Sequence, residues 1–197
     1  MSTDASADPG IGAKARINSM LHCSFDNLGT PESGSVYCLG STKLSRYFPG
    51  LHAMVRPLVP KRKDWSEKEY KAQVADFASK VIAIAVETSP ACDHVQGNLI
   101  IPRLTAGYLV PMDTLQSRVK KGSLPQSIWR LDPLWLTIDG AIASAYGLLV
   151  NCLLVSSCSA LTLRKKKAAF RIRSQAFATL QVCFASHAAR PGMLLLR

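Results

Sequence analysis

A run of twenty-four residues without a charged side chain, from residue 140 to residue 163, constrains this chain more than any other feature. As an α-helix the run would measure roughly 36 Å at 1.5 Å per residue, which exceeds the roughly 30 Å of a bilayer's hydrocarbon core. Four cations follow at once, where a membrane anchor places its cytoplasmic charges: Arg164, Lys165, Lys166 and Lys167. The sequence therefore predicts a transmembrane helix over 140–163, with the cations on the cytosolic side.

The same run also fits a buried element of a soluble core. Asn151, Ser156 and Ser157 make it only moderately apolar, and Gly140 and Gly147 are poor helix formers. The length meets the criterion for a membrane span, whereas the composition leaves a soluble helix or a pair of strands open.

Charge is unevenly distributed along the chain, whose net charge is +11. Up to Asp139, sixteen Lys and Arg residues accompany thirteen Asp and Glu, whereas from Gly140 onward there are eight basic residues and no acidic one. An acid-free basic tail attracts anions, which in a cell are chiefly anionic lipids and nucleic-acid phosphates. We therefore expect an anionic membrane surface to bind these residues: Arg164, Lys165, Lys166, Lys167, Arg171 and Arg173.

Nucleic acid is the alternative partner. RNA or DNA phosphates would contact the same tail together with a second basic set, as in a soluble viral structural protein: Lys61, Arg62, Lys63, Lys120 and Lys121. A third interpretation is that the Ala- and Leu-rich tail comes from sequence never selected to encode protein, in which case it has no designed function.

The predicted fold class is α+β, in four segments. Residues 1–12 read as a disordered N-terminus, 13–139 as a small globular domain, 140–163 as the apolar segment and 164–197 as a basic amphipathic tail. In the globular part, apolar residues at helical spacing predict a long amphipathic helix over about 65–87, with Asp64 and Glu67 as a capping box. Pro and Gly residues divide the stretch before it into short strands.

The C-terminal segment is predicted to be helical as well. Phe170, Phe177, Leu180 and Phe184 recur at a spacing that places them on one face of a helix with a basic start. A helix of this kind can lie on an anionic membrane, follow a phosphate backbone or pack against the protein's own core.

Cysteine and histidine chemistry gives weaker signals. The six cysteines lack CxxC spacing, which favours reduced thiols over a disulfide framework. The adjacent Cys92, Asp93 and His94 allow a cysteine-dependent enzyme that uses Cys92 as nucleophile. A zinc site could be assembled from His22, Cys23, Cys38, Cys92 and His94, but the paired ligand loops typical of structural zinc do not occur, so no metal or other cofactor is predicted.

One short segment resembles a known module. The residues from Pro9 to Ala15, with Gly10 and Gly12 in Gly-x-Gly spacing, resemble the hairpin of helix-hairpin-helix DNA-binding modules. The resemblance implies a turn that presents backbone amides to DNA or RNA phosphate. It covers under a dozen residues, and only eight residues precede it, too few for the module's first helix.

The sequence thus favours a non-enzymatic binding or structural protein on the cytosolic face of a membrane. The competing hypothesis is a soluble cytoplasmic or nuclear protein that binds nucleic acid, and the third is the Cys92 enzyme. A homo-oligomer is a further option, and for the membrane hypothesis small residues such as Gly140 and Ser144 are spaced to let two spanning helices approach closely.

Overall fold

A single antiparallel sheet of seven strands organises the chain in the computed structural model, which describes residues 9–40, 43–97, 99–119, 124–138 and 140–188. The strand order is β1-β7-β2-β3-β4-β6-β5. The strands are β1 (Cys23–Ser24), β2 (Ser35–Cys38), β3 (Ile82–Glu87), β4 (Arg103–Pro111), β5 (Ile128–Leu136), β6 (Ser144–Ser157) and β7 (Phe170–Ile172).

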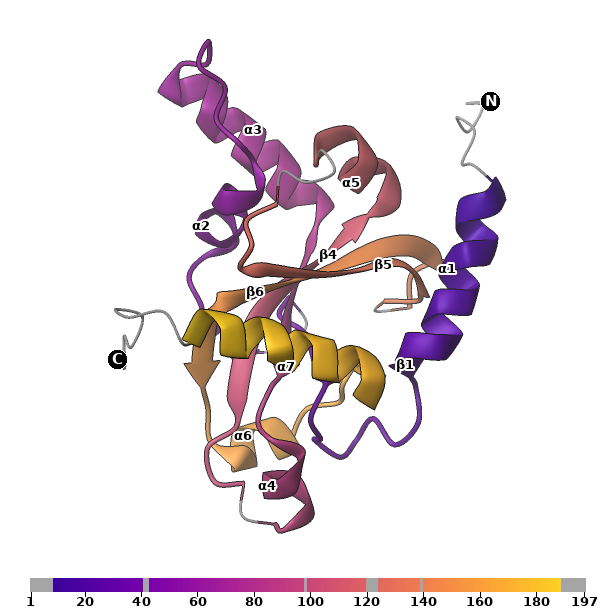
Figure 1. Ribbon diagram of the computed structural model, residues 1–197. Coiled ribbons are helices and arrows are strands. Elements are labelled where there is room, and N and C mark those ends of the chain that lie inside the picture. The colour runs from indigo at the N-terminus through magenta and orange to yellow at the C-terminus, as the bar shows by residue number, and fades with distance from the viewer. Residues whose placement is uncertain (1–8, 41–42, 98, 120–123, 139, 189–197) are drawn as a thin grey trace.

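Helices cover both faces of this sheet (Figure 1). They are α1 (Pro9–His22), α2 (Leu51–Val55), α3 (Glu67–Lys80), α4 (Ala91–Val95), α5 (Met112–Arg118), α6 (Ala160–Arg164) and α7 (Ser174–Ala188), with 3-10 turns η1 (Lys43–Tyr47) and η2 (Arg56–Leu58). One core lies between the sheet and α2, α3, α5 and α6, and a second lies between the opposite face and α7.

Side-chain alternation along the strands divides the apolar residues between the two cores. In β3, Ala85 belongs to the first core while Ile84 and Val86 belong to the second. In β4, Tyr108 packs in the first core and Leu109 in the second. The central strands are therefore buried on both faces, which makes them continuous apolar runs.

The prediction of a helix over 140–163 is wrong, because most of this run forms β6. The strand pairs with β4 on one side and with β5 on the other. Leu149 enters the first core, whereas Leu148 and Val150 enter the second. A central strand with both faces buried is apolar at every position, so its composition imitates that of a membrane helix.

The transmembrane prediction is overturned with it. Among the residues that the structure describes, no helix has the length and apolar character needed to cross a bilayer.

The helix predicted over 65–87 is two elements. The first element is α3, which begins at Glu67. Its N-cap is Ser66, whose side chain forms a capping box with Glu69, so the cap lies two residues after the predicted Asp64. The helix ends at Lys80, and the β-branched, alternating residues that follow form β3. Strand pairing with β2 and β4 overrides the helical spacing in this second part.

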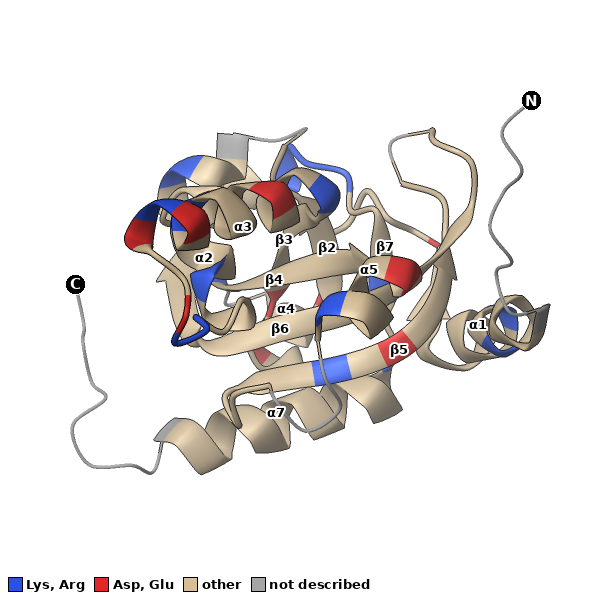
Figure 2. Ribbon diagram, turned by 90° about the horizontal axis from the view of Figure 1, so that it is seen from above, with Lys and Arg blue, Asp and Glu red and all other residues tan. Residues whose placement is uncertain are grey.

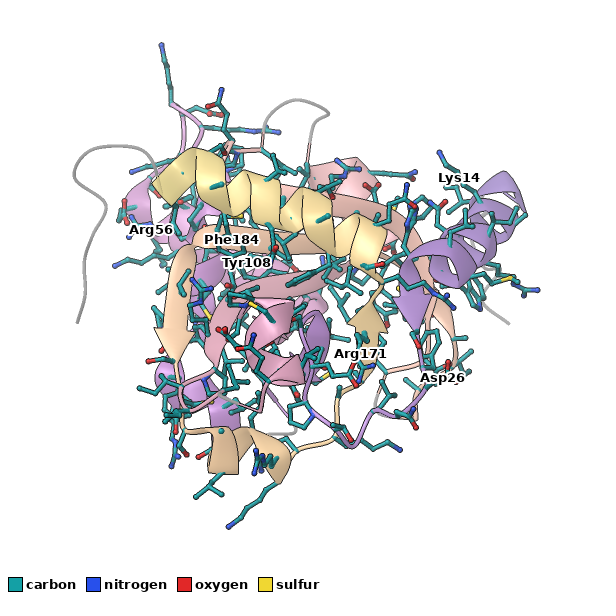
Figure 3. The ribbon with its side chains drawn as sticks, turned by 60° about the horizontal axis from the view of Figure 1, so that its bottom comes forward. Lys14, Asp26, Arg56, Tyr108, Arg171 and Phe184 are labelled. Atoms are coloured by element: carbon teal, nitrogen blue, oxygen red, sulfur yellow. The ribbon has the colours of Figure 1, made fainter. Side chains whose placement is uncertain are left out.

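The predicted fold class fails in the C-terminal part too, since this part completes the sheet rather than following it as a helical tail. Phe170 lies in β7, which pairs with β1 and β2 in the sheet. Only Phe177, Leu180 and Phe184 of the predicted stripe lie on α7, where they pack against the second core (Figure 3). Strands from both sides of the expected boundary at 139/140 thus belong to one mixed α and β fold.

The N-terminal segment also differs from the prediction. Residues 1–8 lie outside the described residues, but Pro9 begins α1, so the segment that resembles a Gly-x-Gly hairpin is helical and presents no turn. The helix packs along β5, where the Ser19 hydroxyl donates to the carbonyl of Trp135 at 3.0 Å and accepts from its amide at 2.6 Å.

Candidate functional site

Two short helices meet at one end of the sheet and form what we call the tip: α4, α6 and residues 99–102. Figure 1 shows α4 and α6 together at the lower end of the molecule. The amide of Ala160 donates to the carbonyl of Ile100 at 3.1 Å, and that of Cys158 donates to Pro102 at 3.3 Å. The Ser159 side chain caps α6 by accepting from the amide of Thr162.

The tip is one of the places where large apolar side chains are exposed; α1, with Met20 at 75%, is another. Val95, Ile100, Ile101 and Leu161 have exposed fractions of 87%, 77%, 63% and 68%. Burying such side chains is the main driving force of folding, so a group of them left in water is a candidate contact surface.

The basic run, Arg164, Lys165, Lys166 and Lys167, begins at the last residue of α6 and continues into the turn before β7. Within the described part of the chain, none of these four cations forms an ion pair. Their charge is therefore uncompensated beside the exposed apolar residues.

A buried carboxylate holds a histidine at the base of the tip. Glu87, the last residue of β3, is fully buried, and its Oε1 accepts from the amide of Ser89 at 3.0 Å. Its Oε2 lies 2.7 Å from Nε2 of His94, whose side chain is 10% exposed. The connection between β3 and α4 thus folds back to bring the two residues together.

Hydrogen bonds fix this connection from both sides. The Ser33 hydroxyl donates to the carbonyl of Ser89 at 2.7 Å, and the amide of Arg103 donates to the Ser89 hydroxyl at 2.9 Å. The hydroxyls of Thr88 and Thr105 lie 2.9 Å apart. The Glu87–His94 pair is therefore held by a preformed frame.

Burial sets the protonation of this region. It raises the pKa of the Glu87 carboxyl, an effect opposed by the hydrogen bonds from Ser89 and by the neighbouring His94. Burial also raises the pKa of the Cys158 thiol, and the nearby charge of Glu87 adds to the effect. An ionised Glu87 is hence costly unless His94 compensates it.

A cavity of about 400 Å³, the tip cavity, opens between α4, α6 and the loop that contains Thr30. His94 and Arg164 both line it, together with Thr30 and Gly97. A second cavity of about 590 Å³ shares Thr30 and His94 and extends toward Arg171 and Arg173. His94 therefore lies between two cavities with basic residues at their walls.

The other two predicted membrane-binding residues have structural contacts. The Arg171 guanidinium pairs with Glu32 at 2.8 Å and donates to the carbonyls of Asn27 and Thr30 (Figure 3). Arg173 donates to the carbonyl of Cys23 at 2.8 Å. Both side chains organise the edge of the sheet, so we do not group them with the basic run.

The second basic set lies elsewhere. Lys61, Arg62 and Lys63 precede α3, at the opposite end of the molecule from α6 in Figure 1. Glu67 pairs with Lys61 at 2.8 Å, and Figure 2 shows acidic and basic residues mixed on α3. Lys120 and Lys121 lie outside the described residues. The described members do not form one continuous surface with the basic run.

The structure does not bring together the residues that were considered for cysteine catalysis and for zinc binding. Cys92 is exposed and donates to Asp93 Oδ1 at 3.5 Å, whereas His94 is bonded to Glu87 instead. Burial raises the pKa of the Cys23 thiol to about 12, which disfavours the thiolate that a metal needs. In the described part of the chain, no three metal-binding side chains are grouped to hold an ion.

Glu87 and the exposed apolar residues of the tip were missed by the sequence predictions. Glu87 was placed at the end of the predicted helix, although an acid directly after six apolar residues is also a signal for a strand end. The exposure of Val95 and Leu161 has no sequence signal, because nothing in the local pattern distinguishes them from core residues.

Comparisons with protein-family models, with curated proteins and with solved structures find no significant match to this chain.

Proposed function

We propose that this protein binds the surface of an anionic membrane through the tip, without a spanning helix and without catalysis. The observation that carries the proposal is the adjacency, at one end of the molecule, of exposed aliphatic side chains and an unpaired basic run. An anionic membrane can bind both kinds of residue, since its headgroups attract the cations and its acyl region accepts the aliphatic side chains.

The magnitudes of the two contributions are comparable. A Lys or Arg near an anionic leaflet contributes about 1 kcal/mol, and full burial of a Val, Leu or Ile side chain contributes about 1.5–3 kcal/mol. Neither the basic run nor the four apolar residues anchor a protein firmly alone, but together they support reversible binding.

Nucleic acid is the less favoured partner. It would use the basic run but leave Val95, Ile100 and Leu161 in water, since phosphate contacts need no aliphatic surface. The basic residues before α3 lie at the other end of the molecule and cannot extend the same binding track. The membrane proposal accounts for both kinds of exposed residue.

Co-sedimentation with vesicles tests the proposal. The full chain is mixed with phosphatidylcholine vesicles that contain or lack phosphatidylserine, and binding is expected only where phosphatidylserine is present. Replacing Lys165, Lys166 and Lys167 by Gln should weaken binding roughly 100-fold, at about 1 kcal/mol for each lost cation. Replacing Ile100 and Leu161 by Ser should weaken it at least tenfold.

Matched controls come from the same chain. Lys63, Lys68 and Lys71 are exposed at the opposite end, so their replacement by Gln removes the same charge without touching the tip. Exposed Met20 on α1 is the apolar control, as Met20→Ser. Binding that depends equally on both lysine sets, or that ignores the apolar substitutions while RNA competes for it, contradicts the membrane proposal.

A further inference from the structure

The tip cavity suggests a specific ligand, and this inference builds on the proposed function. The cavity has the size of a small-molecule site, at about 400 Å³, and it combines apolar walls such as Leu163 with two groups that can bind an anion, His94 and Arg164. A surface that only attracts lipid charge needs no such cavity.

The Glu87–His94 pair determines which ring nitrogen faces a ligand. Nε2 is occupied by Glu87 at 2.7 Å. Nδ1 has no hydrogen-bond partner among the described residues. It is also not fully buried, since the fully buried side-chain atoms that lack a partner do not include it. Because Glu87 occupies Nε2 and His94 lines the cavity, Nδ1 is the ring nitrogen left to bind a ligand there.

Arg164 supplies the second group. It is exposed at the end of α6, lines the same cavity, and has no ion pair with any described residue. A guanidinium with its donors free is suited to bind two oxygens of one phosphate. Asp93 is the one acid on α4, and its carboxylate accepts from the Cys92 thiol.

We propose that the tip cavity binds a phosphate monoester between Nδ1 of His94 and the guanidinium of Arg164, with Glu87 as a positioning residue. A phosphate monoester can bind Nδ1 whether or not this nitrogen carries a proton. The phosphate oxygens accept from a protonated Nδ1, and the P–OH group can donate to an unprotonated Nδ1. A phosphodiester lacks the P–OH and carries less charge than a monoester near neutral pH.

The phosphate monoester has two sources that one experiment separates. Phosphatidic acid carries it in a membrane, and glycerol 3-phosphate carries it in solution. Binding of the full chain is compared on vesicles of phosphatidic acid and of phosphatidylserine with matched surface potential. Calorimetric titrations with glycerol 3-phosphate, and with glycerol as the control, measure the soluble ligand.

We expect roughly tenfold tighter binding to phosphatidic acid than to phosphatidylserine, as one charge-assisted hydrogen bond supplies. Arg164→Gln and His94→Gln should each abolish this preference. Because Arg164 also belongs to the basic run, Arg164→Gln should in addition weaken binding to phosphatidylserine by roughly fivefold, at about 1 kcal/mol for one lost cation. Arg164 is exposed, so its variant should fold even if loss of His94 beside buried Glu87 does not. Lys68→Gln is the charge-matched control and should keep the preference.

The outcomes distinguish failure of the phosphate site from failure of the membrane-binding function. A phosphatidic acid preference alone identifies the lipid as the source, and heat from glycerol 3-phosphate that Arg164→Gln removes extends the site to soluble monoesters. Equal binding to both lipids with no heat from glycerol 3-phosphate overturns the site, and so does a preference that survives both substitutions. Loss of phosphatidylserine binding with retained glycerol 3-phosphate binding overturns the membrane function and leaves the site.

Discussion

Glu87 is the residue at which this fold and its candidate site meet. It ends a central strand, is fully buried, and holds His94 at 2.7 Å. A carboxyl without solvent access is an expensive residue to keep, since a Leu of similar volume would pack without a desolvation cost. Its bond to His94, which lines the tip cavity, supports a role for Glu87 in positioning the imidazole.

The buried Glu87 gives a specific pH dependence of stability. Burial raises its pKa above the ordinary value of 4.5, so above pH 4.5 the folded state holds a proton that the unfolded state releases. The contribution of Glu87 to stability is therefore complete below that pH and is lost as the pH rises through the folded-state pKa. We expect the free energy of unfolding of the wild type to fall, relative to Glu87→Gln, as the pH rises from 4.5.

Urea unfolding of the two proteins at a series of pH values measures this difference. The surface acids Glu67, Glu69 and Asp76 have lowered pKa values, caused chiefly by hydrogen bonds from Lys61, Ser66 and Lys80 respectively, and they give the opposite slope. Both proteins keep these acids, so the difference isolates Glu87. Parallel curves would show that the pKa of Glu87 is the same in the folded and the unfolded states, and would contradict the effect of burial.

Individual site residues were only partly predictable from the sequence. The basic run could be selected as a candidate because consecutive cations are a local signal, and these side chains form no ion pair with any residue that the structure describes. The partnership of Glu87 with His94 spans a turn whose geometry depends on Ser33 and Arg103, which are distant in sequence. No local pattern encodes such a frame.

At the scale of the element, close approach between β4 and β6 depends on Gly107. A Cβ at this position would lie 2.7 Å from the carbonyl oxygen of Leu149 and 3.2 Å from the side chain of Ile84. The register between β4 and β6 also shifts between Thr105 and Gly107, so the ladder is already irregular there. Glycine is required because backbone, unlike a flexible side chain, cannot move aside.

Gly107→Ala should therefore destabilise the protein by about 2 kcal/mol, in the range of overpacked cores. Gly40→Ala is the control, since a Cβ at Gly40 meets nothing within 4 Å, and we expect it to change stability by less than about 0.5 kcal/mol. Chemical denaturation of the two variants measures the difference. Equal stability of both would mean that β4 and β6 separate there at little cost.

The elements show where sequence reasoning failed and why. Helical spacing identified the part of α3 that is helical, from Glu67 to Lys80, because this helix has one buried face. It failed for residues 84–87 of β3 and 147–152 of β6, which are buried on both faces of the sheet and so do not alternate between buried and exposed positions. The fourteen residues of β6 alone are too few for a membrane helix, but the uncharged residues on both sides of the strand extend the run to twenty-four, which meets the length criterion.

At the scale of the whole molecule, the sheet order joins the two ends of the chain. β7 lies between β1 and β2, and Phe170 and Ile172 are fully buried members of the second core. The acid-free composition of the C-terminal part therefore coexists with a structural role, since apolar and β-branched residues are what a central strand needs. The change in charge pattern at residue 140 therefore does not coincide with a break in the sheet.

A chain that stops at Lys167 should consequently fail to fold. It lacks β7 and α7, which leaves β1 and β2 without their shared partner and uncovers the second core. Circular dichroism and heat unfolding should show no cooperative transition, and a peptide of residues 168–188 should restore one. A stable, cooperative fragment would show instead that the N-terminal part is an independent domain.

The place of β7 also has a consequence for synthesis. During translation, β2 and β3 emerge from the ribosome long before residue 172. The edge of β2 that pairs with β7 therefore stays open until β7 has emerged. At about 5–20 residues per second, this edge stays open for many seconds. During this time the open edge of β2 is free to pair with a strand of another chain, so the late arrival of β7 makes synthesis the stage at which this fold is most exposed to misassociation.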